Sequence, residues 1–276
     1  MKKLLEGKIV RENILLDLNK KINKLPKKLK LVIIRVGENP SSKIYVNSKR
    51  KLCEENNILF EEVHYDKDVQ EKTVIEKIKE LNSDNSVTSI LVQLPLPKHI
   101  DEIKVINTIN YKKDVDGLTN VNIGKLISNE NGIKACTGKG IISLLKYYDI
   151  SLKGKNVVIV NRSKLVGKPL IPLLLKEDAT ITVCHSKTKN LSFHTKNADI
   201  LIVAVGIPNF IKKDMINNNT IIIDVGINKV NDKTVGDVSK EVFDYVDIIS
   251  PVPGGVGIMT VVSVLENILE CYYLQN

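Results

Sequence analysis

The hydrophobic and polar positions along the chain alternate between short, continuously apolar runs and segments with helical spacing. Runs such as "LIVAV" and "IIIDV" are apolar throughout, which is typical of strands buried on both faces. Helical spacing occurs at Val69–Leu81 and Leu170–Lys176. This alternation predicts an α/β fold with parallel strands and crossover helices. The predicted strands are Leu29–Val36, Ile58–Tyr65, Val87–Leu94, Asn156–Val160, Thr180–Cys184, Ile200–Val205, Ile221–Val225 and Asp247–Ser250.

The strand–helix pattern divides into two series, separated by Lys112–Gly140. That span is rich in Asp, Asn and Gly and is predicted to be a loop-rich connection at a domain junction. We therefore expect one domain over 1–140 and a second over 141–260, with the helical segment 261–276 packing back on the first. A chain of 276 residues is long enough for two such domains. No apolar run approaches the length needed to cross a bilayer, and no signal peptide is recognisable, so a cytoplasmic protein is expected.

Charge and cysteine content exclude several classes of function. The net charge is +9, but only four of the 41 basic residues are Arg and no dense basic run occurs, so we expect solvated lysine-rich faces rather than a nucleic-acid site. A basic surface could still attract an anionic small substrate. The four cysteines are far apart and form no C-x-x-C pair, so neither a disulfide framework nor a metal site is expected.

The stretch "NVVIVNRSKLVGKPL" predicts a strand, a turn and the start of a helix, as at a phosphate-binding site. Asn161 stands where a dinucleotide site usually has its first glycine, and Asn tolerates positive φ best among the other residues. This loop alone leaves open whether the turn is a dinucleotide site or an ordinary connection. The next strand ends in His185, Ser186 and Lys187, with no carboxylate for a ribose 2′-hydroxyl. Together with Arg162 in the turn, these residues favour the 2′-phosphate of NADP, unless they are merely solvated loop residues.

Other candidate residues lie in the first domain. Tyr45 and Lys49 are four residues apart and share one face of a predicted helix, where a lysine beside an aromatic ring could carry a proton. Such a pair is more often solvent-exposed and without a catalytic role. Gln93 ends a buried strand in "ILVQLPLP", Asp116 lies beside Gly117 in "KKDVDGLTN", and "SPVPGGVGIMT" is a Pro/Gly-rich loop that opens a helix.

Seven motifs occur in a fixed order along the chain. They are Y-x-x-x-K, V-Q-L-P-L-P, K-D-V-D-G, R-S-x-x-V-G-x-P, C-H-S-K-T, D-V-G-I-N and P-V-P-G-G-V-G-x-M-T. In this combination the sequence resembles the bifunctional methylenetetrahydrofolate dehydrogenase/methenyltetrahydrofolate cyclohydrolase family (FolD) over nearly its whole length. The resemblance implies an N-terminal α/β folate-catalytic domain, a Rossmann-like NADP-binding domain, an active-site cleft between them, and a homodimer.

The resemblance also implies roles for individual residues. Lys49 matches the catalytic lysine, Tyr45 the residue that stacks on the folate, Gln93 the residue that orients the lysine, and Asp116 the residue that holds the pterin. Further residues implied to line the tetrahydrofolate site are Val92, Leu94, Pro253, Gly254, Gly255, Val256 and Gly257. Those implied to contact NADP are Asn161, Arg162, Ser163, Ser186 and Ile227.

The sequence departs from the family's pattern at five positions. Asn161 replaces Gly, Ala135 and Gly138 replace prolines, Ser250 replaces Thr, and Ile258 replaces Pro. Two other classes of function stay open as alternatives. One is another two-domain NADP enzyme, such as a shikimate-dehydrogenase-like reductase. The other is a non-catalytic folate- or nucleotide-binding module, although the presence of Lys49 and Gln93 argues against it.

Overall fold

The computed structural model describes residues 3–276, apart from the side chain of Ser41, so the first two residues of the predicted domain 1–140 lie outside the described part. The chain folds into two compact units. Unit 1 comprises residues up to Asn13 together with Thr137–Thr260, and unit 2 comprises Ile14–Cys136 and Val261–Asn276. The three points where the chain passes from one unit to the other lie in helices α1 (Gly7–Ile22), α6 (Cys136–Tyr147) and α10 (Val256–Gln275).

Unit 1 is built on a six-stranded parallel sheet with the strand order β1-β11-β8-β7-β5-β6. Its central strands consist almost entirely of Val and Ile and are fully buried, as strands covered on both faces must be. The strands are β1 (Lys3–Leu4), β5 (Asn156–Val160), β6 (Thr180–Cys184), β7 (Ile200–Val203), β8 (Ile221–Asp224) and β11 (Ile248–Ile249).

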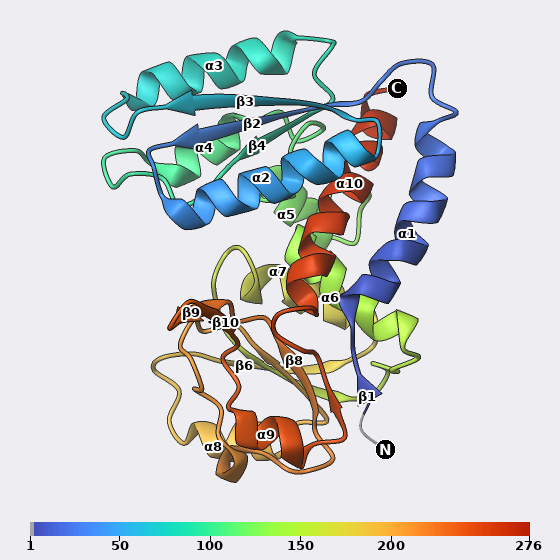
Figure 1. Ribbon diagram of the computed structural model, residues 1–276, viewed down its shortest axis with the longest axis vertical. Coiled ribbons are helices and arrows are strands. Elements are labelled where there is room, and N and C mark those ends of the chain that lie inside the picture. Colours follow the sequence, from blue (N-terminus) through green and yellow to red (C-terminus); the bar gives the residue numbers. More distant parts are fainter. Residues whose placement is uncertain (1–2) are drawn as a thin grey trace. The chain divides into compact units, whose positions relative to one another are not determined.

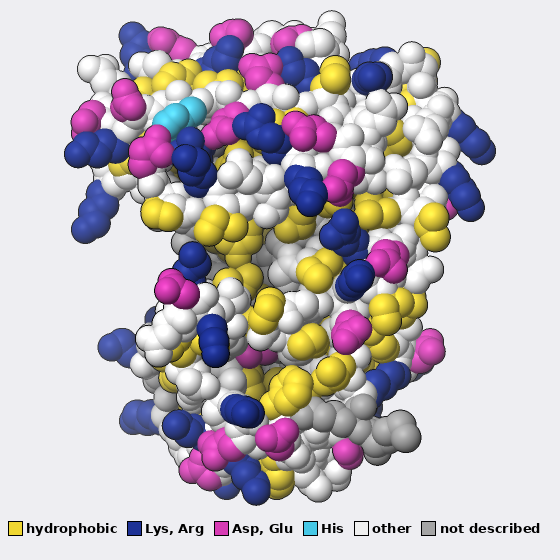
Figure 2. All heavy atoms as spheres, in the orientation of Figure 1, with side chains coloured by type: hydrophobic (Ala, Val, Ile, Leu, Met, Phe, Trp, Pro, Cys, Tyr) yellow, Lys and Arg dark blue, Asp and Glu magenta, His cyan; other side chains and the backbone are white. Residues whose placement is uncertain are grey.

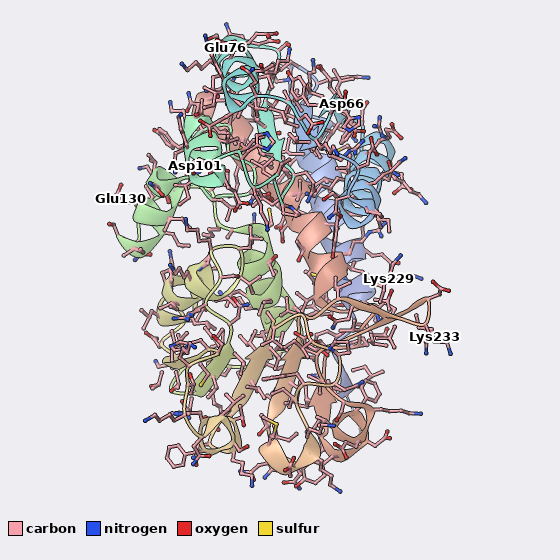
Figure 3. The ribbon with its side chains drawn as sticks, turned by 90° about the vertical axis from the view of Figure 1, so that its left-hand side faces the viewer. Asp66, Glu76, Asp101, Glu130, Lys229 and Lys233 are labelled. Atoms are coloured by element: carbon pink, nitrogen blue, oxygen red, sulfur yellow. The ribbon has the colours of Figure 1, made fainter. Side chains whose placement is uncertain are left out.

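Helices connect these strands (Figure 1). They are α7 (Gly167–Leu175), α8 (Leu191–Lys196), α9 (Lys240–Tyr245) and a short 3₁₀ helix, η1 (Lys213–Met215). A separate antiparallel hairpin, β9 (Asn228–Val230) with β10 (Lys233–Val235), has both turn residues, Asn231 and Asp232, at positive φ. The hairpin carries Lys229 and Lys233 away from the sheet (Figure 3).

Unit 2 contains a three-stranded parallel sheet in the order β3-β2-β4, with β2 (Lys30–Val36), β3 (Leu59–Tyr65) and β4 (Ser89–Val92). On one face, Val32 and Ile34 pack against α3 (Glu71–Ser83) and α4 (Glu102–Thr108). On the other, Leu31 and Ile33 join the core formed with α1, α2 (Pro40–Glu55) and α10. Because side chains alternate between the two faces of a strand, the continuous apolar run of β2 supplies both cores.

The region between the two series differs from the sequence prediction. Lys112–Gly140 was expected to be loop-rich, but it contains the helix α5 (Asn120–Ile127) and the beginning of α6. α5 escapes a periodicity search because it is short and because its inward residue is Asn122, which is completely buried. Thr119 caps this helix by accepting a hydrogen bond from the Asn122 backbone amide.

Helix α10 also corrects an expectation. Within residues 3–276 it is the one helix long and apolar enough, by length and composition alone, to cross a membrane, whereas the sequence analysis expected no such segment. Most of its apolar stretch is buried, and Val264, Leu265, Ile268 and Leu269 lie in the core of unit 2. The core helix of a globular domain has the same composition, because it too is surrounded by apolar neighbours.

Candidate functional site

The sheet of unit 2 reverses its direction of winding between β2 and β4. β3 follows β2 in the chain and lies on one side of it, and β4 lies on the other. In open parallel sheets, ligands bind at the carboxyl ends of the strands beside such a switch point. The segment after β2 leads into α2, which carries Tyr45 and Lys49, and Gln93 directly follows β4 between Val92 and Leu94.

The structure brings Lys49 and Gln93 together at this switch point. The Lys49 side chain is nearly buried, at 7% exposure, and its Nζ donates a hydrogen bond of 3.1 Å to Oε1 of Gln93. The Gln93 amide is itself held, because its Nε2 donates to the carbonyl of Leu94 at 2.9 Å. Tyr45, one turn before Lys49, is half-buried, and burial raises the pKa of its hydroxyl.

Asp116 lies near the same edge of the sheet, because Asp114 forms a parallel bridge to Ile90 of β4 two residues earlier. The carboxylate of Asp114 is buried and accepts hydrogen bonds from the Thr119 backbone amide at 2.8 Å and from Nδ2 of Asn122 at 2.9 Å. Burial raises the pKa of Asp114. Asp114 thus organises the turn, whereas Asp116 stays half-buried and available to a ligand.

The sheet of unit 1 has its own switch point, between β5 and β7, since β6 lies on the other side of β5. The turn after β5 is organised by the Asn161 side chain. Its Oδ1 accepts hydrogen bonds from the backbone amides of Ser163 at 2.7 Å and Gly167 at 2.9 Å, and its Nδ2 donates to the Ala204 carbonyl. Because Asn tolerates positive φ, Asn161 was considered able to do part of a glycine's conformational work, but it is not among the described residues with positive φ. Its side chain shapes the turn instead, as an Asx turn does.

The end of β6 lies next to this turn, because β5 and β6 pair over their whole length. His185, Ser186 and Lys187 follow β6, and no carboxylate occurs in this described loop before Asn190. The loop is closed by a hydrogen bond of 2.8 Å from the His185 amide to Oγ1 of Thr188. Arg162, Ser163 and Ser186 are exposed, so their donors are free to meet a ligand. These groups suit an anionic group on the ribose rather than a free ribose hydroxyl.

The Pro/Gly-rich segment Pro253–Gly257 ends in the first two residues of α10 and belongs to unit 1. The carbonyl of Gly254 accepts a hydrogen bond of 2.8 Å from the Gly7 amide, and Gly254 itself has a φ of +117°. A Cβ at Gly257 would lie 3.3 Å from Cδ1 of Ile227. Two residues assigned by sequence to different ligands, Gly257 and Ile227, are therefore neighbours in unit 1.

The remaining expectations concern cysteines, metals and surface charge. All four cysteines are buried and none forms a disulfide within residues 3–276, and burial raises the pKa of the Cys53 thiol to about 12. Among residues 3–276 no group of three or more His, Cys, Asp or Glu side chains could hold a metal ion. On the face shown in Figure 2, basic and acidic side chains are interspersed, so the positive net charge is not gathered there into one patch.

Comparison with known proteins identifies the family. Residues 5–116 match the model of the tetrahydrofolate dehydrogenase/cyclohydrolase catalytic domain, and residues 135–276 match that of the tetrahydrofolate dehydrogenase/cyclohydrolase NAD(P)-binding domain. The chain belongs to the tetrahydrofolate dehydrogenase/cyclohydrolase family. The resemblance drawn from seven sequence motifs and the two-domain α/β fold class are thereby confirmed.

Individual members of the tetrahydrofolate dehydrogenase/cyclohydrolase family cover the whole chain. The bifunctional protein FolD of Clostridium novyi is 43% identical over 271 residues, covering 96% of this chain and 98% of that protein. The crystal structure of the bifunctional FolD enzyme from Campylobacter jejuni is 41% identical, covers 100% of both chains and has a TM-score of 0.97. The Trypanosoma brucei enzyme, crystallised with NADP cofactor and an inhibitor, is 32% identical, covers 99% of this chain and 98% of its own, and has a TM-score of 0.93.

One positioning residue in unit 2 was missed by sequence reasoning. Asn267, on α10, is fully buried, and its Nδ2 donates hydrogen bonds of 2.8 Å to the carbonyls of both Val115 and Lys134. It thereby holds the segment that carries Asp116 against the segment that leads into α6. An Asn within an otherwise apolar helical face was the available signal, since a buried amide must find partners.

Proposed function

We propose that this chain oxidises 5,10-methylenetetrahydrofolate to 5,10-methenyltetrahydrofolate, with NADP as hydride acceptor, and hydrolyses the methenyl product to 10-formyltetrahydrofolate. Family membership over both domains supports this activity. The folate-binding catalytic domain is proposed to be residues 1–140 with 261–276, and the NADP-binding domain residues 141–260.

The observation that carries the bifunctional assignment is the nearly buried Lys49, hydrogen-bonded to Gln93. Oxidation of the methylene bridge gives a cation that the adjacent nitrogens stabilise, so that step needs positioning more than acid–base chemistry. Hydrolysis is different. Water that adds to the methenyl carbon must lose a proton, and one ring nitrogen must gain a proton before its bond to that carbon breaks. Lys49 is proposed to carry this proton, with Gln93 holding its Nζ in place.

The cofactor is proposed to be NADP, and the residues of unit 1 fit it. Bound NADP would supply the acceptor for the hydride. Arg162, Ser163 and Ser186 would hold its 2′-phosphate, because they are exposed donors at a corner where an NAD site keeps a carboxylate. Asn161 would act through the backbone amides that it orients, and Ile227 would supply apolar contact. The NADP complex of the Trypanosoma brucei relative supports this choice.

Each residue assigned to tetrahydrofolate by the resemblance is proposed to have its own contact with the substrate. Tyr45 would stack on the folate ring system, and Asp116 would bind the pterin through its half-buried carboxylate. Val92 and Leu94 flank Gln93 and would contact the substrate beside it. Pro253, Gly254, Gly255, Val256 and Gly257 would bring backbone close to the substrate, as glycine-rich loops can. We further propose that the protein forms a homodimer, and light scattering, which measures molar mass, would test this. We also propose that it is located in the cytoplasm.

The two activities can be followed together in one experiment. The purified protein is given 5,10-methylenetetrahydrofolate with NADP or NAD, and nucleotide reduction is recorded. Separately, 5,10-methenyltetrahydrofolate is added without nucleotide, and the decay of its ultraviolet absorbance is recorded. We expect nucleotide reduction with NADP and decay of the methenyl compound faster than in buffer. Failure of both reactions would contradict the proposal, and turnover of shikimate instead would favour the rival reductase.

A further inference from the structure

The loop after β7 is built around a buried carboxylate that the proposed mechanism does not use. Asp237 is completely buried, and it accepts hydrogen bonds from the backbone amides of Val205 at 2.6 Å, Gly206 at 3.0 Å and Ile207 at 3.0 Å. Nδ2 of Asn228 donates to the same carboxylate at 2.9 Å. All four groups are donors, so both carboxylate oxygens act only as acceptors.

Three successive amides that point at one anion form an anion-binding nest. Nests of this kind at the ends of strands commonly bind phosphate or another external anion. In this protein the nest of residues 205–207 is filled by the chain's own Asp237, which lies 30 to 32 residues further along the sequence. The loop therefore has its shape set from within unit 1 before any ligand binds.

A second aspartate, Asp224, holds the segment that carries Asp237 in position. Asp224, at the end of β8, accepts hydrogen bonds of 3.0 Å from the backbone amides of Asp237, Val238 and Gly226. A Cβ on Gly226 would clash with the Asp237 carboxyl group, and one on Gly236 would clash with that of Asp224. The segments 224–226 and 236–238 are thus packed reciprocally, each aspartate lying against the glycine of the other segment. Such close packing restricts the Asp237 side chain to one conformation.

This loop lies at the switch point of the six-stranded sheet. It follows β7 and the Asn161 turn follows β5, and β5 and β7 are the two strands between which the winding reverses. The two segments are joined directly, because Nδ2 of Asn161 donates to the Ala204 carbonyl. The position of the nest therefore helps to fix the position of the turn that carries Arg162 and Ser163.

We propose that Asp237 is a positioning residue for the dinucleotide: it occupies the nest of residues 205–207 and holds this loop and the Asn161 turn in the arrangement that binds the cofactor. The proposal rests on the proposed NADP-dependent function. Asp237 acts through backbone and not by touching the nucleotide. Its loss should therefore weaken nucleotide binding while leaving methenyl hydrolysis, assigned to Lys49 in unit 2, largely intact.

The test compares isosteric variants in the full-length protein. Asp237→Asn keeps the shape of the side chain but turns one acceptor into a donor that faces other donors. We expect its dissociation constant for NADPH, measured by nucleotide fluorescence, to rise by about tenfold or more, which is at least about 1.4 kcal/mol. Methenyl hydrolysis without nucleotide should stay within about twofold of the parent rate, a loss of at most about 0.4 kcal/mol. Asp199→Asn is the matched control, since Asp199 also binds a backbone amide but at the opposite end of β7.

A rescue experiment separates the anion from general stability. Asp237→Ala opens space next to the nest, and formate should restore part of the NADPH affinity, whereas formamide at equal concentration should not, because only formate is an anion. If Asp237→Asn did not fold, Asn228→Ala, which removes one donor to Asp237, should weaken NADPH binding by a smaller factor.

The possible failures are distinguishable. A parent protein that does not bind NADPH would contradict the proposed function itself. A parent that binds NADPH, with Asp237→Asn binding it equally well, would overturn only the role of Asp237. Equal loss of hydrolysis and NADPH binding in both Asp237→Asn and Asn228→Ala would also overturn it, because Asp237 would then stabilise the whole chain rather than the loop.

Discussion

At the scale of single residues, Lys49 is distinguished by being a nearly buried ammonium held by a neutral amide. Lys49→Met keeps the length and apolar stem of the side chain but removes the proton carrier. We expect methenyl hydrolysis to fall by about a hundredfold or more, the range usual for a lost acid–base group, while NADP reduction remains measurable. Methenyltetrahydrofolate should then accumulate, which its ultraviolet absorbance reports.

Lys51→Met is the matched control for this prediction. Lys51 lies on the same helix, but its side chain is 79% exposed and forms an ion pair with Glu55 at 3.8 Å. Lys51→Met should leave the rates of methenyl hydrolysis and of NADP reduction unchanged. Hydrolysis at the parent rate in Lys49→Met would show that another group carries the proton. Loss of both reactions would show that Lys49 also positions the substrate.

Arg162 is the second residue whose role can be measured alone. Charge-assisted hydrogen bonds contribute about 1.5–3 kcal/mol each, so losing one of them from the 2′-phosphate should weaken NADP binding by about one to two decades. Arg162→Ala should raise the Michaelis constant for NADP strongly and that for NAD little. Lys155→Ala removes a charge directly before the first residue of β5, at the end of the strand away from Arg162, and should change neither Michaelis constant. Equal Michaelis constants for the two nucleotides in the parent would contradict this assignment.

At the scale of an element, helix α10 combines an apolar surface with one buried amide that determines how it packs. Asn267 holds the carbonyls of Val115 and Lys134. Replacing it with Ala would leave these acceptors without that donor, and each buried unsatisfied group costs about 1–3 kcal/mol. Asn267→Ala should therefore lower the free energy of unfolding by about 2–4 kcal/mol, measured by chemical denaturation.

Ser263, one turn before Asn267 on α10, provides a control, because its buried polar group contrasts with that of Asn267 in its hydrogen bonding. It is fully buried, and its Oγ has no hydrogen-bond partner among the described residues. Ser263→Ala removes a group that already lacks a partner, so stability should stay the same or rise by about 1 kcal/mol. If Asn267→Ala were as mild as Ser263→Ala, the hydrogen bonds of Asn267 would not be what holds the two segments.

At the scale of the whole molecule, buried carboxylates make stability depend on pH. Burial raises the pKa of Asp224 from 3.8 to about 6, and the nearby charge of Asp237 acts in the same direction, although three backbone hydrogen bonds oppose them. A raised pKa in the folded state means that the folded protein binds the proton more tightly than the unfolded chain. This contribution is fully present below pH 3.8 and is lost as the pH rises through about 6.

The consequence is measurable as a difference between two proteins. Relative to Asp224→Asn, the parent should lose up to about 1.4 kcal/mol of unfolding free energy per pH unit between about pH 4 and pH 6, and no more above that range. Urea unfolding at a series of pH values measures this difference. A constant difference between the parent and Asp224→Asn would show that the pKa of Asp224 is not raised.

Each predicted strand begins and ends within two residues of an observed strand. β5 and β6 begin and end at the residues that periodicity predicted. In β5 this agrees with a Val- and Ile-rich run that is almost entirely buried, because such side chains favour the extended conformation of a covered strand. α5 was missed because its inward residue is Asn122, whose partners Asp114 and Tyr111 lie elsewhere in the chain. Asn161 was considered as a replacement for glycine in the backbone of the turn, but its side chain, which donates a hydrogen bond to the Ala204 carbonyl, organises the turn instead.

The sequence by itself determined the parallel α/β class, the family and the residue types of both candidate sites, since motifs and local periodicity are written along the chain. Tertiary structure decided where those residues meet. Strand order places Gln93 beside the helix of Lys49, and the loop after β7 beside the Asn161 turn. It also paired Asp237 with amides about thirty residues away. Such pairings depend on which strands become neighbours, and a buried polar group finds its partners only once the sheet has closed around it.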